Sequence, residues 1–268
     1  MLGIIVGESN LPKYLIYKLV KNKIKFIILD ITKKNIYKNY KNSYKLHITQ
    51  LGKAISILKR NNCNKIILIG KVTRPELSFF KIDKTTLFNF STIFRAFKKG
   101  DGFILKEIIK IFKKNNIKVL NSMTYTKELI FSQKNLNNVK TTTQDLLSIK
   151  KGVSILNSLS KYDIAQAVIV NNGFVLAVEG PEGTDEAIRR SGKISRQLKL
   201  KNKSILIKLP KLNQDIRTDL PTLGYLTVKN CIKNNIKGIA IKKSKNIILE
   251  KDKIFRIAKN NNFFIKGL

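Results

Sequence analysis

Carboxylates, an arginine and turn-forming residues are concentrated in one stretch, Lys211–Gly224 (KLNQDIRTDLPTLG). It follows a β-branched run at 205–209 and precedes a segment at 221–234 whose pattern predicts a helix. Its polar side chains of interest are Gln214, Asp215, Arg217 and Asp219. Carboxylate oxygens hold hard cations such as Mg²⁺, and arginine binds phosphate bidentately. The stretch therefore predicts phosphate chemistry on a loop between a strand and a helix.

Asp219 has a second interpretation that concerns the predicted helix at 221–234. Asp is a preferred N-cap residue, and Pro221 suits a first helical turn. The site would then lie at a helix N-terminus, where phosphate is favoured. An ordinary capped loop has the same residues, so that alternative stays open at this point.

A second concentration of polar residues is Glu179–Arg190 (EGPEGTDEAIRR). Thr184 is expected to cap a new helix, with Asp185 in its first turn and Arg189 four residues later on the same face. The alternative is an ordinary capped helix that carries an ion pair.

A third phrase, Gly70–Glu76 (GKVTRPE), follows the apolar run KIILIG. Thr73 and Arg74 are therefore expected at the carboxyl end of a parallel sheet, beside the loop that contains Gly7. Ligands of open α/β sheets bind at that edge.

The composition is strongly basic, with 53 Lys and Arg against 17 Asp and Glu among 268 residues and a net charge of +36. Such a charge is typical of partners that are nucleic acids or anionic membranes. The excess is mostly Lys, accompanied by abundant Asn and Ile, which all have A/T-rich codons, so genome bias explains much of it. No basic arm, zinc-knuckle spacing or aromatic-interleaved RNA motif is present, so nucleic acid is not an expected partner. A non-catalytic nucleotide or nucleic-acid binding protein is the alternative function.

The residues that ligate soft metals are scarce. Cys63 and Cys231 are isolated, and His47 is the single histidine. This excludes zinc sites and His-dependent triads, so any metal is expected to be a hard cation on oxygen ligands. No apolar run reaches the roughly 18 residues of a membrane span. The chain is expected to be cytoplasmic, soluble or peripheral.

Hydrophobic periodicity predicts alternating strands and helices in the first half of the chain. The expected strands are 2–6, 25–30, 65–70 and 117–120, and the expected helices are 11–21, 51–61, 86–97 and 103–114. Continuously apolar strands are typical of a parallel sheet covered on both faces, so this half is expected to be Rossmann-like. The turn at Gly7 lacks the spaced glycines of GxGxxG, so bound NAD is not expected.

The second half is expected to be another α/β domain. Its expected elements are helix 143–159, strands 165–170 and 174–179 around an Asn-Gly turn, a helix from Thr184, strand 204–209, helix 221–234, strands 238–241 and 246–250, helix 252–261 and strand 263–265. A polar, Asn- and Thr-rich stretch separates the halves. The expected domains are therefore 1–132 and 143–268, with a linker at 133–142.

Together, and in this order, GKVTRPE, EGPEGTDEAIRR and QDIRTDLPTLG resemble the I-type UDP-2,3-diacylglucosamine pyrophosphatases of lipid A biosynthesis. The resemblance implies a cytoplasmic, Mg²⁺-dependent hydrolase with two α/β domains that hold the substrate between them. It implies cleavage of UDP-2,3-diacylglucosamine into UMP and 2,3-diacylglucosamine 1-phosphate (lipid X), with attack at the phosphorus on the lipid side. A pyrophosphate diester is anionic and inert to water, so a cation, a positioned water and donors for the developing charge suit this reaction.

The resemblance also implies roles for individual residues. Activity is expected to depend on Asp219, with Asp215 and Glu179 as further catalytic carboxylates. Any of the three can hold Mg²⁺ through oxygen, and we assign the metal to Asp219 and Asp215. The implied substrate-binding residues are Thr73, Arg74, Lys99, Asp101, Gln166, Gly183, Thr184, Asp185, Arg189, Gln214 and Arg217.

Two further expectations concern the first loop and the lipid. The family's glycine cluster after the first strand is replaced here by Gly7-Glu8-Ser9. The acyl chains need an apolar groove, for which Phe79, Phe80, Phe88 and Phe90 are candidates. The positive charge is expected to hold the protein on the anionic inner face of the inner membrane.

Overall fold

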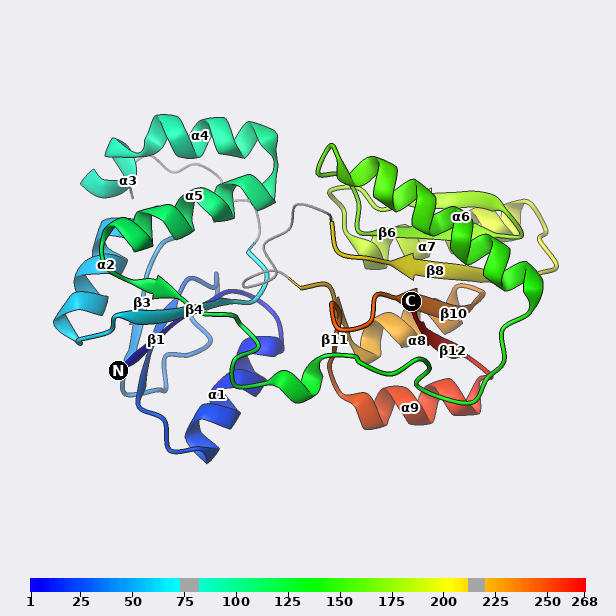
Figure 1. The fold of residues 1–268 in the computed structure, drawn as a ribbon, viewed down its shortest axis with the longest axis horizontal. Helices are drawn as coiled ribbons and strands as arrows, with labels where there is room; N and C mark the ends of the chain where they lie inside the picture. Colours follow the sequence, from blue (N-terminus) through cyan, green and yellow to red (C-terminus); the bar gives the residue numbers. More distant parts are fainter. Residues whose placement is uncertain (73–81, 212–219) are drawn as a thin grey trace. The chain divides into compact units, whose positions relative to one another are not determined.

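The computed structural model describes residues 1–72, 82–211 and 220–268, which divide into two compact units. The described part of one unit is contained in Met1–Lys127, and the other begins at Glu128 and ends at Leu268 (Figure 1). Both units are α/β, as predicted. Among the described helices, none combines the length and apolarity needed to cross a bilayer.

The first unit is built on a five-stranded, entirely parallel sheet in the order β3-β2-β1-β4-β5. Its strands are β1 (Leu2–Val6), β2 (Phe26–Asp30), β3 (Ser43–Lys45), β4 (Lys65–Ile69) and β5 (Lys118–Val119). This is the strand order of a Rossmann sheet. Successive strands are added on one side of β1 as far as β3, and the chain then crosses to the other side of β1 to form β4. The prediction of a Rossmann-like half is therefore confirmed. Strand β3 was not predicted, because three residues are too few to establish a period.

Helices cover both faces of this sheet (Figure 1). Helix α1 (Leu11–Lys21) lies on one face, and α2 (Leu51–Arg60) and α5 (Asp101–Lys114) lie on the other. The buried side chains of α2 and α5 form one apolar core with those of β2 and β4. The alternation of buried positions along these helices explains why periodicity predicted them.

The predicted single helix at 86–97 is wrong, because two helices occupy this stretch. They are α3 (Lys84–Phe88) and α4 (Phe90–Lys99), separated by Asn89. The Asp83 carboxylate accepts a hydrogen bond from Thr86 N at 2.9 Å, which starts α3 early. Asn89 Nδ2 donates to Thr85 O at 2.9 Å and so competes with continuation of the helix.

The second unit has a mixed five-stranded sheet in the order β12-β10-β8-β6-β7. Its strands are β6 (Ala167–Asn171), β7 (Phe174–Val178), β8 (Ser204–Lys208), β10 (Ile236–Ile241) and β12 (Phe264–Gly267). Strand β6 runs opposite to the other four strands, which are parallel to one another. One apolar core lies between this sheet and α6 (Thr143–Ser160). Another lies between the sheet and α7 (Thr184–Gln197), α8 (Tyr225–Lys233) and α9 (Lys251–Asn260).

The hairpin of β6 and β7 turns at Asn172 and Gly173, as the Asn-Gly step predicted. Their φ angles are +43° and +85°, which is the pair of left-handed residues that a type I′ turn requires.

The predicted helix at 221–234 begins four residues late. Helix α8 starts at Tyr225, with Gly224 as its N-cap. The residues before it form β9 (Thr222–Leu223), which pairs in parallel with β11 (Ile247–Ile248). Pro221 is therefore not in a first helical turn, and Asp219 is not the N-cap of this helix.

The residues of the expected linker, 133–142, bond to the second unit. Leu136 N donates to Ile265 O at 2.9 Å, and Asn137 Nδ2 donates to Phe263 O at 2.7 Å. At the end of this stretch, Thr142 and Asp145 form a capping box that starts α6.

Candidate functional site

Three polar residues meet at one edge of the second sheet. Because β6 is antiparallel to β7 and β8, the carboxyl ends of β7 and β8 lie beside the start of β6. Glu179 follows β7, Lys208 ends β8 and Gln166 precedes β6. The topology thus brings together residues that are far apart in the sequence.

Three side chains and one backbone N–H, that of Gln166, form a hydrogen-bonded group centred on Thr184, which we call the Thr184 cluster: Gln166, Glu179, Thr184 and Lys208. Thr184 Oγ1 donates to Glu179 Oε1 at 2.7 Å, and Lys208 Nζ donates to Thr184 Oγ1 at 2.6 Å. Gln166 N donates to Glu179 Oε2 at 2.9 Å. The expectation that Thr184 caps α7 is wrong, because Gly183 is the N-cap and the Thr184 hydroxyl bonds to Glu179 and Lys208 instead.

Lys208 is the member of the cluster that the sequence analysis missed. Its residue is only 6% exposed, so a cationic side chain is held largely out of water. Burial of a charge is costly unless hydrogen bonds compensate it. The available signal was a lysine at the end of an otherwise apolar strand, SILIK, directly before the acidic loop.

The turn between β7 and α7 contains a residue in a conformation that favours glycine. Gly183 has a φ of +88°. Glu182 accepts a hydrogen bond from Arg190 at 2.7 Å, and Arg190 also donates to Val178 O at 2.8 Å. A hydrogen bond from its own backbone N–H and the Arg190 guanidinium lower the pKa of Glu182. These contacts fix the chain between Glu179 and Thr184.

The ion pair between Asp185 and Arg189, which belonged to the alternative interpretation of this motif, is absent from the described contacts. Arg189 Nε instead donates to Glu186 at 2.8 Å, and Asp185 accepts from Asn230 Nδ2 of α8 through its carbonyl oxygen at 3.0 Å. Side chains four residues apart face each other on a helix, but Glu186, at three residues, competes for the same arginine.

A buried thiol lies beneath the cluster. Burial raises the pKa of Cys231 well above its usual value, and Asp185 raises it further, whereas Lys208 lowers it. The charges of Lys208 and Asp185 therefore both change the pKa of this buried thiol. Cys231 itself is fully buried, which favours a packing role.

The two ends that bracket residues 212–219 are each held to the second unit by hydrogen bonds. At one end, Leu209 N donates to Gln166 O at 2.8 Å, and Lys211 Nζ donates to Asp163 O at 2.6 Å. At the other end, Ile247 N donates to Pro221 O at 2.9 Å. The chain that carries the predicted aspartates therefore leaves and rejoins the described structure next to well-held residues.

Several predicted site residues lie outside the described residues. They are Thr73, Arg74, Gln214, Asp215, Arg217 and Asp219, together with the candidate groove residues Phe79 and Phe80. Lys99 ends α4 and Asp101 begins α5, with Gly100 between them at a φ of +125°. Of the predicted residues in the second unit, Gln166, Glu179, Gly183 and Thr184 come together, whereas Arg189 faces solvent.

In the first unit, the loops after β1 and β4 bond to each other. Glu8 N donates to Lys71 O at 2.7 Å, and Lys71 N donates to Glu8 O at 2.6 Å. In dinucleotide-binding folds this loop uses backbone N–H groups to hold a pyrophosphate. Here the N–H of Glu8 donates to Lys71 O and so does not face a ligand. This is consistent with Gly7-Glu8-Ser9 standing where the family has a glycine cluster.

The acid at the end of β2 is also used internally. Asp30 is fully buried, and its carboxylate accepts from Thr32 N at 2.7 Å and from Tyr37 N at 3.3 Å. A nucleotide ribose normally takes an acid at this position. Asp30 instead organises the loop between β2 and β3.

The described residues contain no group of three or more His, Cys, Asp or Glu side chains arranged to hold a metal. Glu179 has both oxygens in hydrogen bonds, and its partner Thr184 binds an ammonium. This environment fits a carboxylate that positions other groups better than one that binds a divalent cation.

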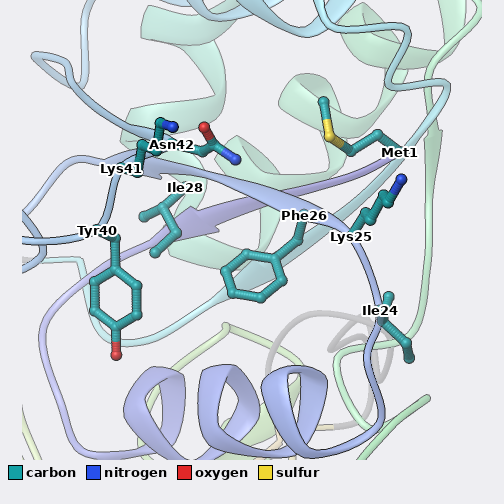
Figure 2. A pocket seen from close by; sticks show the side chains of 8 residues that line it. All are labelled: Met1, Ile24, Lys25, Phe26, Ile28, Tyr40, Lys41 and Asn42. Carbon is teal, nitrogen blue, oxygen red and sulfur yellow. The ribbon is translucent and has the colours of Figure 1, made fainter.

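A shallow hollow of about 400 Å³ lies at the amino end of β2 in the first unit (Figure 2). Its lining is mostly apolar, with two lysines: Met1, Ile24, Lys25, Phe26, Ile28, Tyr40, Lys41 and Asn42. It contains none of the predicted site residues. Because ligands of such sheets bind at the carboxyl edge, the hollow is not the site that the motifs predict.

Comparison with known proteins covers both units. The family model of the LpxI N-terminal domain matches residues 1–129, and that of the LpxI C-terminal domain matches residues 132–266. The chain is also similar to a protein of Caulobacter vibrioides that is named UDP-2,3-diacylglucosamine pyrophosphatase LpxI. The two are 26% identical over 229 residues, which cover 82% of this chain and 80% of the relative.

Proposed function

The chain belongs to the LpxI family, and on that premise we propose that it hydrolyses the pyrophosphate bond of UDP-2,3-diacylglucosamine in lipid A synthesis. The products would be UMP and 2,3-diacylglucosamine 1-phosphate. The observation that carries the proposal is the match of both LpxI domains, in order, over nearly all of the chain. The named activity of the Caulobacter relative supports it.

In this proposal Lys208 and Thr184 bind the pyrophosphate. The buried Lys208 ammonium is a fixed positive charge beside the Thr184 hydroxyl, at 2.6 Å. Thr184 is also the first residue of α7, and helix N-termini favour phosphate. A preorganised donor and cation stabilise the charge that develops on phosphate oxygens during transfer.

Glu179 positions this pair. It accepts from the Thr184 hydroxyl and from Gln166 N, which fixes its carboxylate beside the start of β6. A rotamer held at both oxygens keeps the Thr184 hydroxyl at one place. Gln166 supports this positioning through its backbone N–H, and Gly183 is the N-cap residue before Thr184.

In this proposal Asp215 and Asp219 would hold Mg²⁺, because carboxylates are the hard oxygen donors that this cation prefers. When bound, the metal would neutralise charge on the pyrophosphate. The donors that fit it are in the chain between Lys211 and Leu220, because Glu179 is already hydrogen-bonded on both oxygens. Arg217 and Gln214 would bind substrate from the same stretch, as would Thr73, Arg74, Lys99 and Asp101 from the first unit.

The proposed place of action is the cytoplasmic face of the inner membrane, where a diacylated substrate is presented. The net charge of +36 supports attraction to an anionic bilayer surface.

The test is product analysis by mass spectrometry after incubation of the purified full chain with UDP-2,3-diacylglucosamine and Mg²⁺ in ¹⁸O-labelled water. Release of UMP and lipid X, with the label in lipid X, is expected. Absence of both products, with chelator-treated and Mg²⁺-supplied samples alike inactive, would contradict the proposed reaction.

A further inference from the structure

Large apolar side chains are exposed where α3 meets α4. Phe88 is 90% exposed and Leu87 is 63% exposed. Phe94, in the second turn of α4, is 39% exposed. Phe94 stacks on Phe90 with ring centroids 5.7 Å apart. Single exposed apolar residues are ordinary on a soluble protein, but a group of them marks an interaction surface.

Cationic side chains surround these apolar groups. Lys84, Arg95 and Lys98 are exposed, and the Lys98 ammonium lies 5.1 Å from the centroid of the Phe94 ring. No Asp or Glu occurs between residues 84 and 100. We call Lys84, Leu87, Phe88, Phe94, Arg95 and Lys98 the α3–α4 surface.

Among the described elements, the helices that carry this surface pack on α2 and α5. Helix α4 lies on α5, in a layer farther from the sheet than α5 (Figure 1). Within α4, Ala96 is buried and Ile93 and Phe97 are partly buried, whereas Phe94, Arg95 and Lys98 are exposed. The break at Asn89 directs the chain so that Leu87 and Phe88 stand at a bend between two short helices.

We infer that the α3–α4 surface inserts into the headgroup region of an anionic lipid bilayer, with Leu87 and Phe88 entering the acyl boundary. The inference rests on the proposed function in so far as that function gives the protein a lipid substrate. Amphipathic elements of this composition, with Leu and Phe beside Lys and Arg, bind bilayer interfaces. The cations would lie at the level of the anionic headgroups.

The charge favours a bilayer over a second copy of this chain. Two copies would bring Lys84, Arg95 and Lys98 against their own equivalents, with no described acid on the surface to compensate, and like charges repel. An anionic surface satisfies the same cations. Helix α4 also ends at Lys99, so the surface is continuous in the chain with predicted substrate-binding residues.

The first experiment uses the absence of tryptophan from the chain. In Phe88→Trp the single indole would report on its surroundings, with Tyr17→Trp, at an exposed position of α1, as the matched reporter. Addition of phosphatidylcholine vesicles that contain phosphatidylglycerol should shift the emission of Phe88→Trp to shorter wavelength, and brominated acyl chains should quench it. Tyr17→Trp should change little. Equal behaviour of the two reporters would overturn the inference.

The second experiment compares two double variants by vesicle co-sedimentation. Leu87→Ser/Phe88→Ser removes the apolar tip, and Leu146→Ser/Leu147→Ser removes an adjacent exposed pair on α6. Loss of two inserted side chains should weaken vesicle binding about tenfold or more. The α6 control should bind like the unaltered chain, and phosphatidylcholine alone should bind all three weakly.

Hydrolysis of a short-acyl, detergent-dispersed substrate separates this inference from the proposed function. Leu87→Ser/Arg95→Ser, which alters the α3–α4 surface but leaves the candidate acyl contact Phe88 in place, should retain that activity and bind anionic vesicles more weakly than the unaltered chain. Unaltered vesicle binding by this variant would overturn the inference even if the enzyme is active, as would a dimer in sedimentation velocity that the variant alone abolishes. Surface-dependent vesicle binding without any hydrolysis would support the surface and count against the proposed reaction.

Discussion

The buried ammonium of Lys208 donates a hydrogen bond to the hydroxyl oxygen of Thr184, with 2.6 Å between Nζ and Oγ1. One residue ends β8 and the other begins α7, so the contact joins a strand to the helix that covers it. A cation with 6% exposure is held beside a hydroxyl that is itself fixed by Glu179. The following predictions test whether this arrangement serves catalysis.

Lys208→Met should lower kcat/KM for UDP-2,3-diacylglucosamine. Hydrogen bonds to charged groups contribute about 1.5–3 kcal/mol, so the loss should be about tenfold to about a hundredfold. Met keeps much of the side-chain volume but leaves Thr184 Oγ1 without its donor, so a loss of about 1–3 kcal/mol in the free energy of unfolding is expected beside the loss of activity. Steady-state kinetics and thermal unfolding measure both.

Lys203→Met is the matched control for that variant. It removes one exposed lysine just before the same strand, with the same change in net charge. It should leave kcat/KM and the melting temperature unchanged. Equal activity of the Lys208 and Lys203 variants would show that the buried ammonium has no role in turnover.

Thr184→Val should separate the hydroxyl from the shape of the side chain. Val removes both hydrogen bonds at nearly constant volume, leaving partners of a partly buried group unsatisfied at a cost of about 1–3 kcal/mol. Activity should fall together with the free energy of unfolding. Thr184→Ser keeps the hydroxyl and should recover most of both. If Ser and Val variants are equally impaired, the methyl group and not the hydroxyl matters.

Much of the fold could be predicted from the sequence. Strong periods gave α1 and β1 with the observed ends, and the Asn172-Gly173 step gave the hairpin, because these signals are local. The start of α8 could not be predicted locally. Pro221 suits a first helical turn, but pairing of β9 with β11, which is remote in the sequence, holds these residues extended.

In the candidate site, too, features set by neighbouring residues could be predicted, whereas features set by residues remote in the sequence could not. The motif around Glu179 and Thr184 was recognised, because its glycines and polar residues are close in the sequence. Lys208 was not recognised. Its role depends on the sheet, in which β6 lies between β7 and β8 and brings the carboxyl ends of those two strands to the same edge. The ion-pair partner of Arg189 could not be chosen from the sequence, because Asp185 and Glu186 are four and three residues from it and spacing alone does not decide between them.

Tyr37 should make stability fall at alkaline pH. Its side chain is buried, its hydroxyl has no hydrogen-bond partner among the described residues, and burial, followed by Asp30, raises its pKa to about 12. A raised folded-state pKa means that the stabilisation is complete below pH 10 and is lost as the pH rises from about 10 through about 12. The maximum loss corresponds to about 3 kcal/mol for two pKa units.

Tyr37→Phe should remove this decline and cost little at neutral pH, because a buried unsatisfied hydroxyl is replaced by hydrogen. Urea unfolding at neutral pH and near pH 11 measures the difference. Tyr40→Phe, at a 43% exposed position, should keep the decline of the unaltered chain. Parallel curves for Tyr37→Phe and the unaltered chain would contradict the assignment to Tyr37.

Asp219→Asn should abolish most turnover and leave folding unchanged. The alternative role for Asp219 was to cap a helix, but α8 begins at Tyr225 and its N-cap is Gly224. Asn keeps the shape of Asp but loses the charge that holds a hard cation or attracts a water proton. We therefore expect kcat to fall by about two orders of magnitude or more, in line with loss of an acid–base or metal-binding group. The melting temperature should stay within about 2 °C, since a change of 1 kcal/mol moves it by about 2–4 °C in a chain of this size.

Asp219→Ala extends the argument, because Ala is a poor N-cap and Asn is a good one. If Asp219 capped a helix, Ala would lower the melting temperature and Asn would not. We expect both variants to unfold like the unaltered chain and both to lose most of their turnover. Mg²⁺ titration of residual activity in Asp219→Asn then distinguishes the two catalytic roles. A requirement for much higher Mg²⁺ indicates a metal ligand, and an unchanged requirement with low kcat indicates a residue that orients the attacking water. Near-normal turnover in both variants would exclude Asp219 from the chemistry.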